Sequence, residues 1–466
     1  MENRLSGIDS IVLFRNSQGV PGRGTLVHIT RRAVVFEVYN PYSIVQTSEA
    51  LSEFQVLRGE RIIYHGKATV SSLVTTGLMV IASAMLDDTW ADRSGLLPGE
   101  GLQAEAERFI HDWEASHSFN PSYQISVSTI GNFLGELGRW IQEAETGVFD
   151  TDDPENQDPL KQAFFNEVAE PVVPRIIELH GAFEEAARQI PPEELVPHKV
   201  FARRIIHPLT MCAPFVHRTF TKPLGYAGDY EMVNMILRES ADMGSSTYAR
   251  IVQEYNIYTG APEAHRNRIV MLEERLKNEA LRVIEEARPF TVLNVGCGPA
   301  VEVQRFIRNE DLSNHAVFQL MDFNDETLEY AQDKIQHAIK ESGRKPMVRF
   351  IHKSIDSLLK EAIDQLDSNQ PAYEMIYCAG LLDYLTDRTC KYLVELFYNW
   401  LRPGGFMTVT NVHPNNPVRY SMEHFLEWHL IYRDENDMRA LAPPDVEKKV
   451  ATDVTGLNVF LDIRKE

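Results

Sequence analysis

The stretch VLNVGCGPAVE, residues 292–302, decides the fold of the C-terminal half of this chain. Apolar residues typical of β-strands lead straight into Gly296-Cys297-Gly298, and a segment compatible with a helix follows. This order predicts a strand, a tight glycine turn and the start of a helix. Because glycine lets the backbone approach a ligand closely and a helix N-terminus has unpaired N–H groups, we expect a ligand at this turn.

A second apolar run ends in an acid further along the chain. It spans Val317 to Asp322, and the acid is its last residue. An acid at the tip of the second strand of such a unit is placed to bind the two hydroxyls of a ribose. We therefore predict that Asp322, together with the adjacent Phe323, binds the nucleoside part of a cofactor.

The glycine turn distinguishes two cofactor classes. A dinucleotide fold needs G-x-G-x-x-G around a pyrophosphate, but position 301 is Val, and Pro299 lacks the N–H that a pyrophosphate would use. S-adenosylmethionine (SAM) has no phosphate and tolerates both. The run resembles motif I of the class I SAM-dependent methyltransferases, which implies that residues 294, 296 and 298 contact SAM: Asn294, Gly296 and Gly298. It departs from that motif at Asn294, where an acid is usual, and at Ala300, where a glycine is usual.

The later strands follow in the order of a doubly wound parallel sheet, at Met347–His352, Tyr373–Cys378 and Phe406–Asn411. The methyltransferase resemblance implies that Ser354 and Ile355 lie near the adenine and that Cys378 lies at the strand exit beneath the sulfonium. The phrase LRPGGF before the fifth strand is also common in methyltransferases. The tail, 457–463, is expected to add an antiparallel edge strand.

Length and composition set the frame. A chain of 466 residues is too long for one core and predicts two or three domains. The four cysteines form no C-x-x-C pair, so we expect no metal site and no disulfide framework, as in a cytoplasmic protein. A net charge of −21 disfavours binding to nucleic acid.

A membrane span is not expected. Ala68 to Leu86 holds nineteen uncharged residues, which approaches transmembrane length. Six of them are Ser or Thr, and a Thr-Thr-Gly sequence interrupts the run, so two β-strands around a turn explain it better. The polar N-terminus shows no secretory signal.

Residues 1–95 are predicted to form a small β-barrel, because short β-rich runs alternate with turn residues. The region faintly resembles PilZ domains, which bind cyclic-di-GMP. Its equivalent of their binding turn, 28–33, lacks the expected Asp and Gly, so we expect no cyclic dinucleotide there, although Arg31 and Arg32 could touch a phosphate. A scaffold role or a homodimer contact is the favoured interpretation. The seven runs are 11–14, 24–29, 33–38, 55–57, 61–64, 68–74 and 78–86.

Residues 96–270 are predicted to be helical, and residues 271–466 to form the SAM-dependent methyltransferase domain. Apolar residues at three- and four-residue spacing predict helices at 105–113, 130–145, 160–189 and 270–286. Between two of these, residues 143–159 carry seven acids and no base, which predicts a solvated linker.

One stretch of the helical region does not look like simple packing. FTKPLGYAGDYEM, residues 220–232, combines turn-forming glycines with hydroxyl-bearing rings, and it predicts a lid or substrate clamp that uses Tyr226. An ordinary turn with packed tyrosines is the alternative. Tyr258 and Arg268 are candidates to cap SAM and to pair its carboxylate, because arginine forms bidentate pairs. Arg266, or a solvated helix face, is the other interpretation of that arginine.

Three segments together resemble one bacterial family. KPLGYAGDYEMVNM, NVGCGPA and EWHLIYR are similar to sequences of the 3-hydroxypalmitic acid methyl ester biosynthesis proteins, over roughly residues 200–466. The resemblance implies SAM-dependent methylation of the carboxyl of a 3-hydroxy fatty acid, which yields a quorum-sensing signal. The alternatives are a SAM-binding sensor without turnover and a methyltransferase for another small metabolite or a protein.

The acceptor determines which side chains are needed. A carboxylate is ionised at neutral pH and needs no base, whereas a hydroxyl would need one. His413, just after the fifth strand, is the candidate to orient or deprotonate the acceptor, and Arg419 and Tyr226 are candidates to hold a carboxylate. A helix at 421–432 is expected to wall an acyl pocket, or else to pack in the core, through Trp428, His429 and Tyr432.

Overall fold

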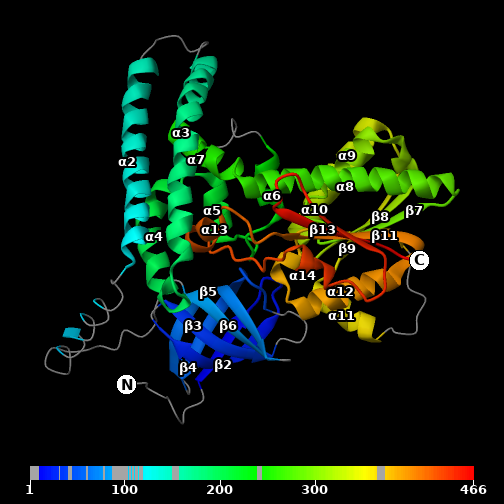
Figure 1. The fold of residues 1–466 in the computed structure, drawn as a ribbon, viewed down its shortest axis with the longest axis horizontal. Helices are drawn as coiled ribbons and strands as arrows, with labels where there is room; N and C mark the ends of the chain where they lie inside the picture. The colour runs from blue at the N-terminus through cyan, green and yellow to red at the C-terminus, as the bar shows by residue number, and fades with distance from the viewer. Residues whose placement is uncertain are drawn as a thin grey trace.

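The computed structural model contains three regions: a barrel, a set of helices and an α/β unit (Figure 1). It describes residues 10–30, 32–39, 45–58, 61–76, 79–86, 119–149, 157–238, 244–364 and 373–466, with a few isolated positions between 103 and 114. The predicted helix at 105–113 and Arg31 therefore lie outside the described residues, apart from single positions.

The N-terminal region is a closed six-stranded barrel, in the order β1-β2-β3-β6-β5-β4. Its lumen is filled by Phe14, Phe36, Phe54 and Tyr64, whose neighbouring ring centroids lie 5.7–6.2 Å apart. The barrel was predicted, but two of the expected strands are one, because β5 continues through Gly66 and pairs there with a bulge of β4. The strands are β1(Ser10–Arg15), β2(Pro21–Ile29), β3(Ala33–Tyr39), β4(Ala50–Arg58), β5(Arg61–Thr76) and β6(Met79–Leu86).

The helical region packs mainly through α2(Pro121–Phe149) and α3(Gln157–Arg188), the long pair in Figure 1. Because α2 runs on to residue 149 and α3 begins at 157, the described residues of the expected acidic linker are helical instead. The other helices are shorter: α4(Leu195–Thr210), α5(Pro214–Thr221), α6(Tyr230–Leu237) and α7(Thr247–Ile257), with the 3-10 turn η2(Pro192–Glu194).

The C-terminal region is a seven-stranded sheet in the order β12-β13-β11-β10-β7-β8-β9. The predicted doubly wound arrangement is confirmed, because β9, β8, β7, β10 and β11 are parallel neighbours. The strands are β7(Phe290–Val295), β8(Ala316–Asp322), β9(Met347–His352), β10(Tyr373–Cys378), β11(Leu401–Val412), β12(Lys448–Thr452) and β13(Asn458–Arg464). The helices are α8(Gly260–Glu285), α9(Val301–Asn309), α10(Asp325–Ser342), α11(Ile355–Asp364), α12(Asp387–Trp400), α13(Arg419–Phe425) and α14(Glu435–Arg439), with η4(Asp311–His315) and η5(Leu382–Tyr384).

The tail strand is antiparallel as expected, but it is not at the edge of the sheet. β13 pairs with β11 on one side and with β12 on the other. Most of its side chains are buried, whereas those of β12 are intermediate or exposed. The buried strand therefore takes the inner place, and the half-exposed one, which was not predicted, forms the edge.

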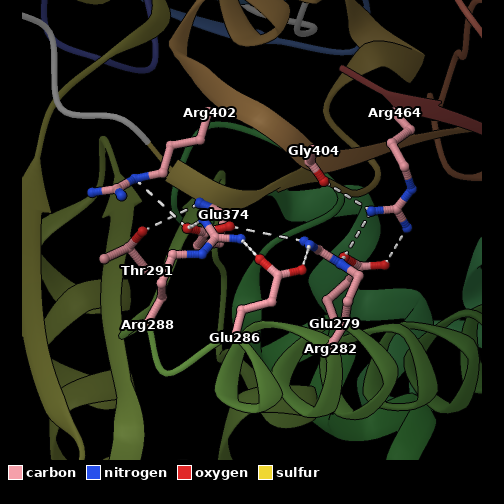
Figure 2. Close-up of polar contacts among 9 residues, drawn as sticks. All are labelled: Glu279, Arg282, Glu286, Arg288, Thr291, Glu374, Arg402, Gly404 and Arg464. Atoms are coloured by element: carbon pink, nitrogen blue, oxygen red, sulfur yellow. Dashed lines mark hydrogen bonds and ion pairs between the residues drawn. The ribbon is translucent and has the colours of Figure 1, made fainter. Parts of the chain in front are cut away.

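An ion cluster joins the elements at the N-terminal ends of the parallel strands (Figure 2). Glu374 of β10 is fully buried, and its carboxylate pairs with Arg288 and lies 3.8 Å from Arg282 and 3.7 Å from Arg402. Glu279 of α8 bonds Arg282 at 2.9 Å and Arg464 at 3.1 Å. The cluster ties α8 to β10, β11 and β13 at the end of the strands opposite the glycine turn.

Glu374→Gln is expected to lower the free energy of unfolding by about 1–3 kcal/mol, because it removes a buried charge that several arginines surround. Glu53→Gln is the matched control: its pair with Arg15 is half exposed, and such pairs contribute about 0–1 kcal/mol. Urea unfolding of both variants measures the difference, and equal losses would contradict a stabilising role for the cluster.

Candidate functional site

A cavity of about 210 Å³ extends from the glycine turn into the helical region. Its glycine end is the part lined by Gly296, Gly298, Arg268 and Asp383, at the carboxyl edge of the parallel strands. Its helical end is mostly apolar and is lined by side chains of α3 to α7, among them Ile176, Ile206, Phe215, Met232, Ile236 and Val252. One continuous space therefore adjoins both the predicted cofactor turn and a large apolar wall.

The backbone of the glycine turn is left-handed at three positions. Gly296 and Gly298 have φ of 69° and 52°, and Ala300 has a φ of 50°, in the left-handed region that favours glycine. A left-handed conformation costs a non-glycine residue about 1–2 kcal/mol, so the alanine holds the same turn at some cost. A Cβ on Gly298 would meet nothing within 4 Å, so the turn leaves open space on the side of the cavity.

Asp322 lies at the end of β8, as predicted, and 7% of its surface is exposed. One carboxylate oxygen accepts the N–H of Gly298 at 3.1 Å, and the other accepts the N–H of Asn324 at 3.1 Å. Burial raises the pKa of Asp322, whereas these backbone hydrogen bonds lower it. The acid thus braces the glycine turn that it was expected to accompany, and Phe323 follows it at the same edge.

Asn294 lines the cavity. It stands where motif I usually has an acid, and the neighbouring carboxyl group is that of Glu302 instead. Its amide donates to Oε1 of Glu302 at 3.1 Å, and the Tyr377 hydroxyl donates to the same oxygen at 2.7 Å. Burial raises the pKa of Glu302. We did not predict Glu302, although it lies in the first turn of α9 and ends the quoted stretch.

Arg268 of α8 lines the glycine end and is 9% exposed. Its Nη2 lies 2.9 Å from Nδ1 of His265, and its guanidinium packs against Gly380, where a Cβ would come within 3.0 Å of Nη1. Among the described residues, no carboxylate lies within 4.0 Å of it. Burial lowers the pKa of Arg268, whereas the charges of Asp383 and Glu302 raise it.

Tyr258 and Arg266 are placed differently. Tyr258 is 46% exposed and does not line the cavity, and the Arg266 guanidinium stacks over its ring at 5.0 Å. Arg266 also donates to the carbonyls of Ile236 and Ile257. Of the two candidate arginines, only Arg268 faces the cavity.

The other predicted cofactor residues lie around the end of β8 or in the core. Ser354 accepts the N–H of Ser357 at 3.2 Å, ahead of α11, and Ile355 is buried. The adjacent Lys353 donates its N–H to the carbonyl of Asp322 at 2.9 Å, which keeps this segment beside β8. Cys378 is buried in the core of the α/β region and does not line the cavity.

Neither His413 nor Arg419 lines the cavity. His413 accepts the N–H of Asn415 through Nδ1 and lies 3.3 Å from a carboxylate oxygen of Glu435. Arg419 pairs with Glu423 at 2.8 Å and stacks over Tyr432 at 4.7 Å. Both side chains are thus engaged by other groups, and the structure does not bring them together with Tyr226.

The segment 222–229, named here the tyrosine loop, is held from several sides. Lys222 donates to the carbonyl of Leu426 at 3.0 Å, and the carbonyl of Gly225 accepts the N–H of Ala50 in the barrel at 2.7 Å. Asp229 caps α6 and pairs with Arg218 at 2.8 Å. The Tyr226 ring lies 5.3 Å from that of Phe323. The loop therefore forms a fixed wall between the barrel and the end of β8.

Two residues that we did not predict complete the glycine end. Asp383 accepts the N–H of Val412 at 2.7 Å, and burial raises its pKa to about 6. The Tyr384 hydroxyl accepts the indole N–H of Trp428 at 3.0 Å. Both residues lie in the loop that follows Cys378, whose strand exit was expected beneath the sulfonium, so a local signal could have identified them.

The helix expected at 421–432 ends early, and this changes the wall that it was to form. α13 stops at Phe425, and Glu427 has a left-handed φ of 48°. Its buried carboxylate lies 2.6 Å from Arg203 and 3.9 Å from Lys199, so pairing this charge with α4 overrides the helical pattern. Of the three predicted wall residues, Trp428 lines the cavity, whereas His429 bonds Ser48 of the barrel and Tyr432 lies against Arg419.

In the part of the chain that the structure describes, no group of His, Cys, Asp or Glu is arranged to hold a metal ion. Within the same residues, no helix is both long enough and apolar enough to cross a bilayer. All four cysteines are free.

Comparison with known proteins finds likeness in structure only. No family model matches the chain, and no curated protein does. It is similar to a solved structure described as a possible exported protein from Bordetella parapertussis (16% identity, 54% of this chain and 86% of the other, TM-score 0.41). It is also similar to the N-methyltransferase NodS from Bradyrhizobium japonicum WM9 in complex with S-adenosyl-L-homocysteine (14% identity, 43% of this chain and 87% of the other, TM-score 0.29). A third similar structure is that of an O-methyltransferase family protein from Burkholderia thailandensis (15% identity, 46% of this chain and 63% of the other, TM-score 0.30).

Asp322→Ala is expected to weaken SAM binding by about 1–3 kcal/mol, because it removes a hydrogen-bonding carboxylate from the cofactor turn. Asp325→Ala is the matched control, since that carboxylate lies three residues further on and is 75% exposed. Calorimetric titration with SAM measures both variants. Unchanged affinity in Asp322→Ala would remove this residue from the site.

Proposed function

We propose that this chain is a SAM-dependent methyltransferase that methylates the carboxyl of an acid with a large apolar body. A 3-hydroxy fatty acid is the acceptor that the sequence resemblance implies. The observation that carries the proposal is the single cavity in which the glycine turn and the apolar helical end meet. The free cysteines are consistent with a cytoplasmic protein.

The residues at the glycine end fit the chemical groups of SAM. Asp322, which braces the turn from beside the cavity, would offer a carboxylate to ribose hydroxyls, and the open space at Gly298 admits a ligand against the backbone. Arg268 offers a buried guanidinium that has no carboxylate partner among the described residues, which suits the methionine carboxylate. When bound, SAM supplies an electrophilic methyl group.

The helical end fits the body of the acceptor. Burial of apolar surface contributes about 25 cal/mol per Å², so the affinity for an acyl chain against this wall would increase with the length of the chain. At the glycine end, positioning of the carboxylate would be the main contribution to rate. Trp428, whose indole N–H bonds the Tyr384 hydroxyl, also lines the cavity.

A hydroxyl or amine acceptor is the second candidate, and Asp383 favours it. This buried carboxylate lines the cavity, and with a pKa of about 6 it could act as a base at neutral pH. The two candidates differ in their pH dependence. Methylation that requires Asp383 as a base falls as the pH drops through about 6, whereas methylation of a carboxylate does not require this deprotonation.

The test uses SAM with a labelled methyl group and a panel of acceptors: 3-hydroxy fatty acids, unsubstituted fatty acids, aromatic alcohols and proteins. The expected product is a methyl ester, from which alkaline hydrolysis releases labelled methanol. An ether or a methylamine keeps its label under the same treatment and would support the second candidate. Calorimetric binding of SAM without transfer to any acceptor would support a sensor instead and overturn the proposal.

A further inference from the structure

The helical end of the cavity contains one imidazole among apolar side chains, that of His180 on α3. It is 6% exposed, its ring lies 4.5 Å from that of Tyr255, and Phe425 packs against it edge-on at 5.8 Å. This histidine is not part of the predicted site, and the methyl transfer proposed above makes no use of it.

The hydrogen bonding of His180 is incomplete. Nδ1 lies 3.4 Å from Oγ of Ser421, a long contact, and Nε2 has no hydrogen-bond partner among the residues that the structure describes. Ser421 is fixed in turn, because Glu184, one turn after His180 on α3, accepts the N–H groups of Tyr420 and Ser421 at 2.8 and 2.6 Å. The imidazole is therefore held in place while one of its nitrogens remains available.

The environment sets the charge of this group. Burial lowers the pKa of His180 to about 3, so the ring is neutral, with one nitrogen that donates and one that accepts. The phenol of Tyr255 and the hydroxyl of Ser421, both lining the same cavity, are neutral donors or acceptors as well. A polar atom without a partner in an apolar cavity is unfavourable, and a neutral ligand group would satisfy it.

We propose that His180, supported by Ser421 and Tyr255, recognises a hydroxyl group on the apolar body of the acceptor and so selects a hydroxylated acyl chain over a plain one. The inference rests on the proposed function, because it assumes that the acceptor occupies the helical end. A site built to bond a hydroxyl discriminates against an analogue that lacks it, because its polar groups are then left unpaired.

The test measures equilibrium binding, so that it does not depend on turnover. Fatty acids of one chain length, unsubstituted or with a hydroxyl at carbon 3, in mid-chain or at the terminal carbon, are titrated calorimetrically into the full chain saturated with S-adenosylhomocysteine. We expect one hydroxyl position to bind about tenfold more tightly than the unsubstituted chain, the usual worth of one hydrogen bond.

His180→Phe keeps a ring against Tyr255 and removes both nitrogens, so this preference should disappear while the affinity for the unsubstituted chain remains. His217→Phe, at an exposed position of α5, is the matched control and should keep it. Should His180→Phe fail to fold, Ser421→Ala tests the same contact and should reduce the preference.

Two results would overturn the inference: no hydroxyl preference at any position, or a preference that persists in folded His180→Phe or, if that variant does not fold, in Ser421→Ala. If the unmodified protein binds the fatty acids without such a preference, this inference fails and the proposed function stands. If it binds none of them, both fail.

Discussion

Replacement of Arg268 by methionine is expected to weaken SAM binding by at least about a hundredfold. Removing one partner of a buried ion pair costs about 3–5 kcal/mol, because the other charge is left without compensation. Here that charge would be the methionine carboxylate, which the Arg268 guanidinium is proposed to bind at the glycine end of the cavity. Arg268→Lys should recover only part of the affinity, since a lysine cannot form the same bidentate pair.

Calorimetry with SAM gives the dissociation constants, and a thermal melt without SAM shows whether each variant is folded. Arg266→Met is the matched control on the same helix, and it should bind SAM as the parent does, because that guanidinium bonds backbone carbonyls and does not line the cavity. A loss in Arg266→Met equal to that in Arg268→Met would assign the effect to α8 in general.

Tyr226→Phe is expected to lower turnover on the order of a hundredfold and to leave the fold intact. Misplacement of reacting groups by about an ångström has a cost of that size. The Tyr226 ring lies against Phe323, beside the acid that closes the glycine turn, and its pKa is raised first by burial and then by the charge of Asp322. Loss of the hydroxyl removes a polar contact there and keeps the packing.

A packing role gives the opposite pattern. Tyr226→Phe would then be fully active, and Tyr226→Ala would be destabilised by about 3–5 kcal/mol, as for other large aromatic truncations. Tyr230→Phe is the matched control within the same motif, because its hydroxyl bonds Glu326 at an exposed position. Turnover and melting temperature of the three variants separate the two roles.

Much of the α/β region could be predicted because its signals are local. An apolar run that leads into two closely spaced glycines predicts a strand followed by a tight turn, because glycine readily adopts positive φ. Apolar runs of β-formers between helical patterns predict a parallel sheet. The inner position of β13 could not be found in this way. Strand order depends on which strand buries more apolar surface. The amount of surface that a strand buries depends on its pairing with segments that are distant in the sequence.

The candidate site shows the same division. Asn294, Gly296, Gly298 and Asp322 were predicted from the pattern around one turn, and they lie together at the glycine end or beside it. His413 was predicted from its position after a strand and Arg419 as a residue that holds a carboxylate, but contacts with Glu435 and Glu423 engage these side chains, and neither lines the cavity. Glu302 was missed because its contact with Asn294 and Tyr377 joins two strands and a helix.

The sequence by itself determined the glycine turn, the acid that accompanies it and the alternation of strands and helices, because these depend on the backbone preferences and polarity of neighbouring residues. Only the tertiary structure decided what the turn faces. Helices from residues 157 to 257 supply the apolar wall, and burial lowers the pKa of His180 and raises that of Asp383. Cavities and pKa shifts arise from groups far apart in the chain, so no local pattern carries them.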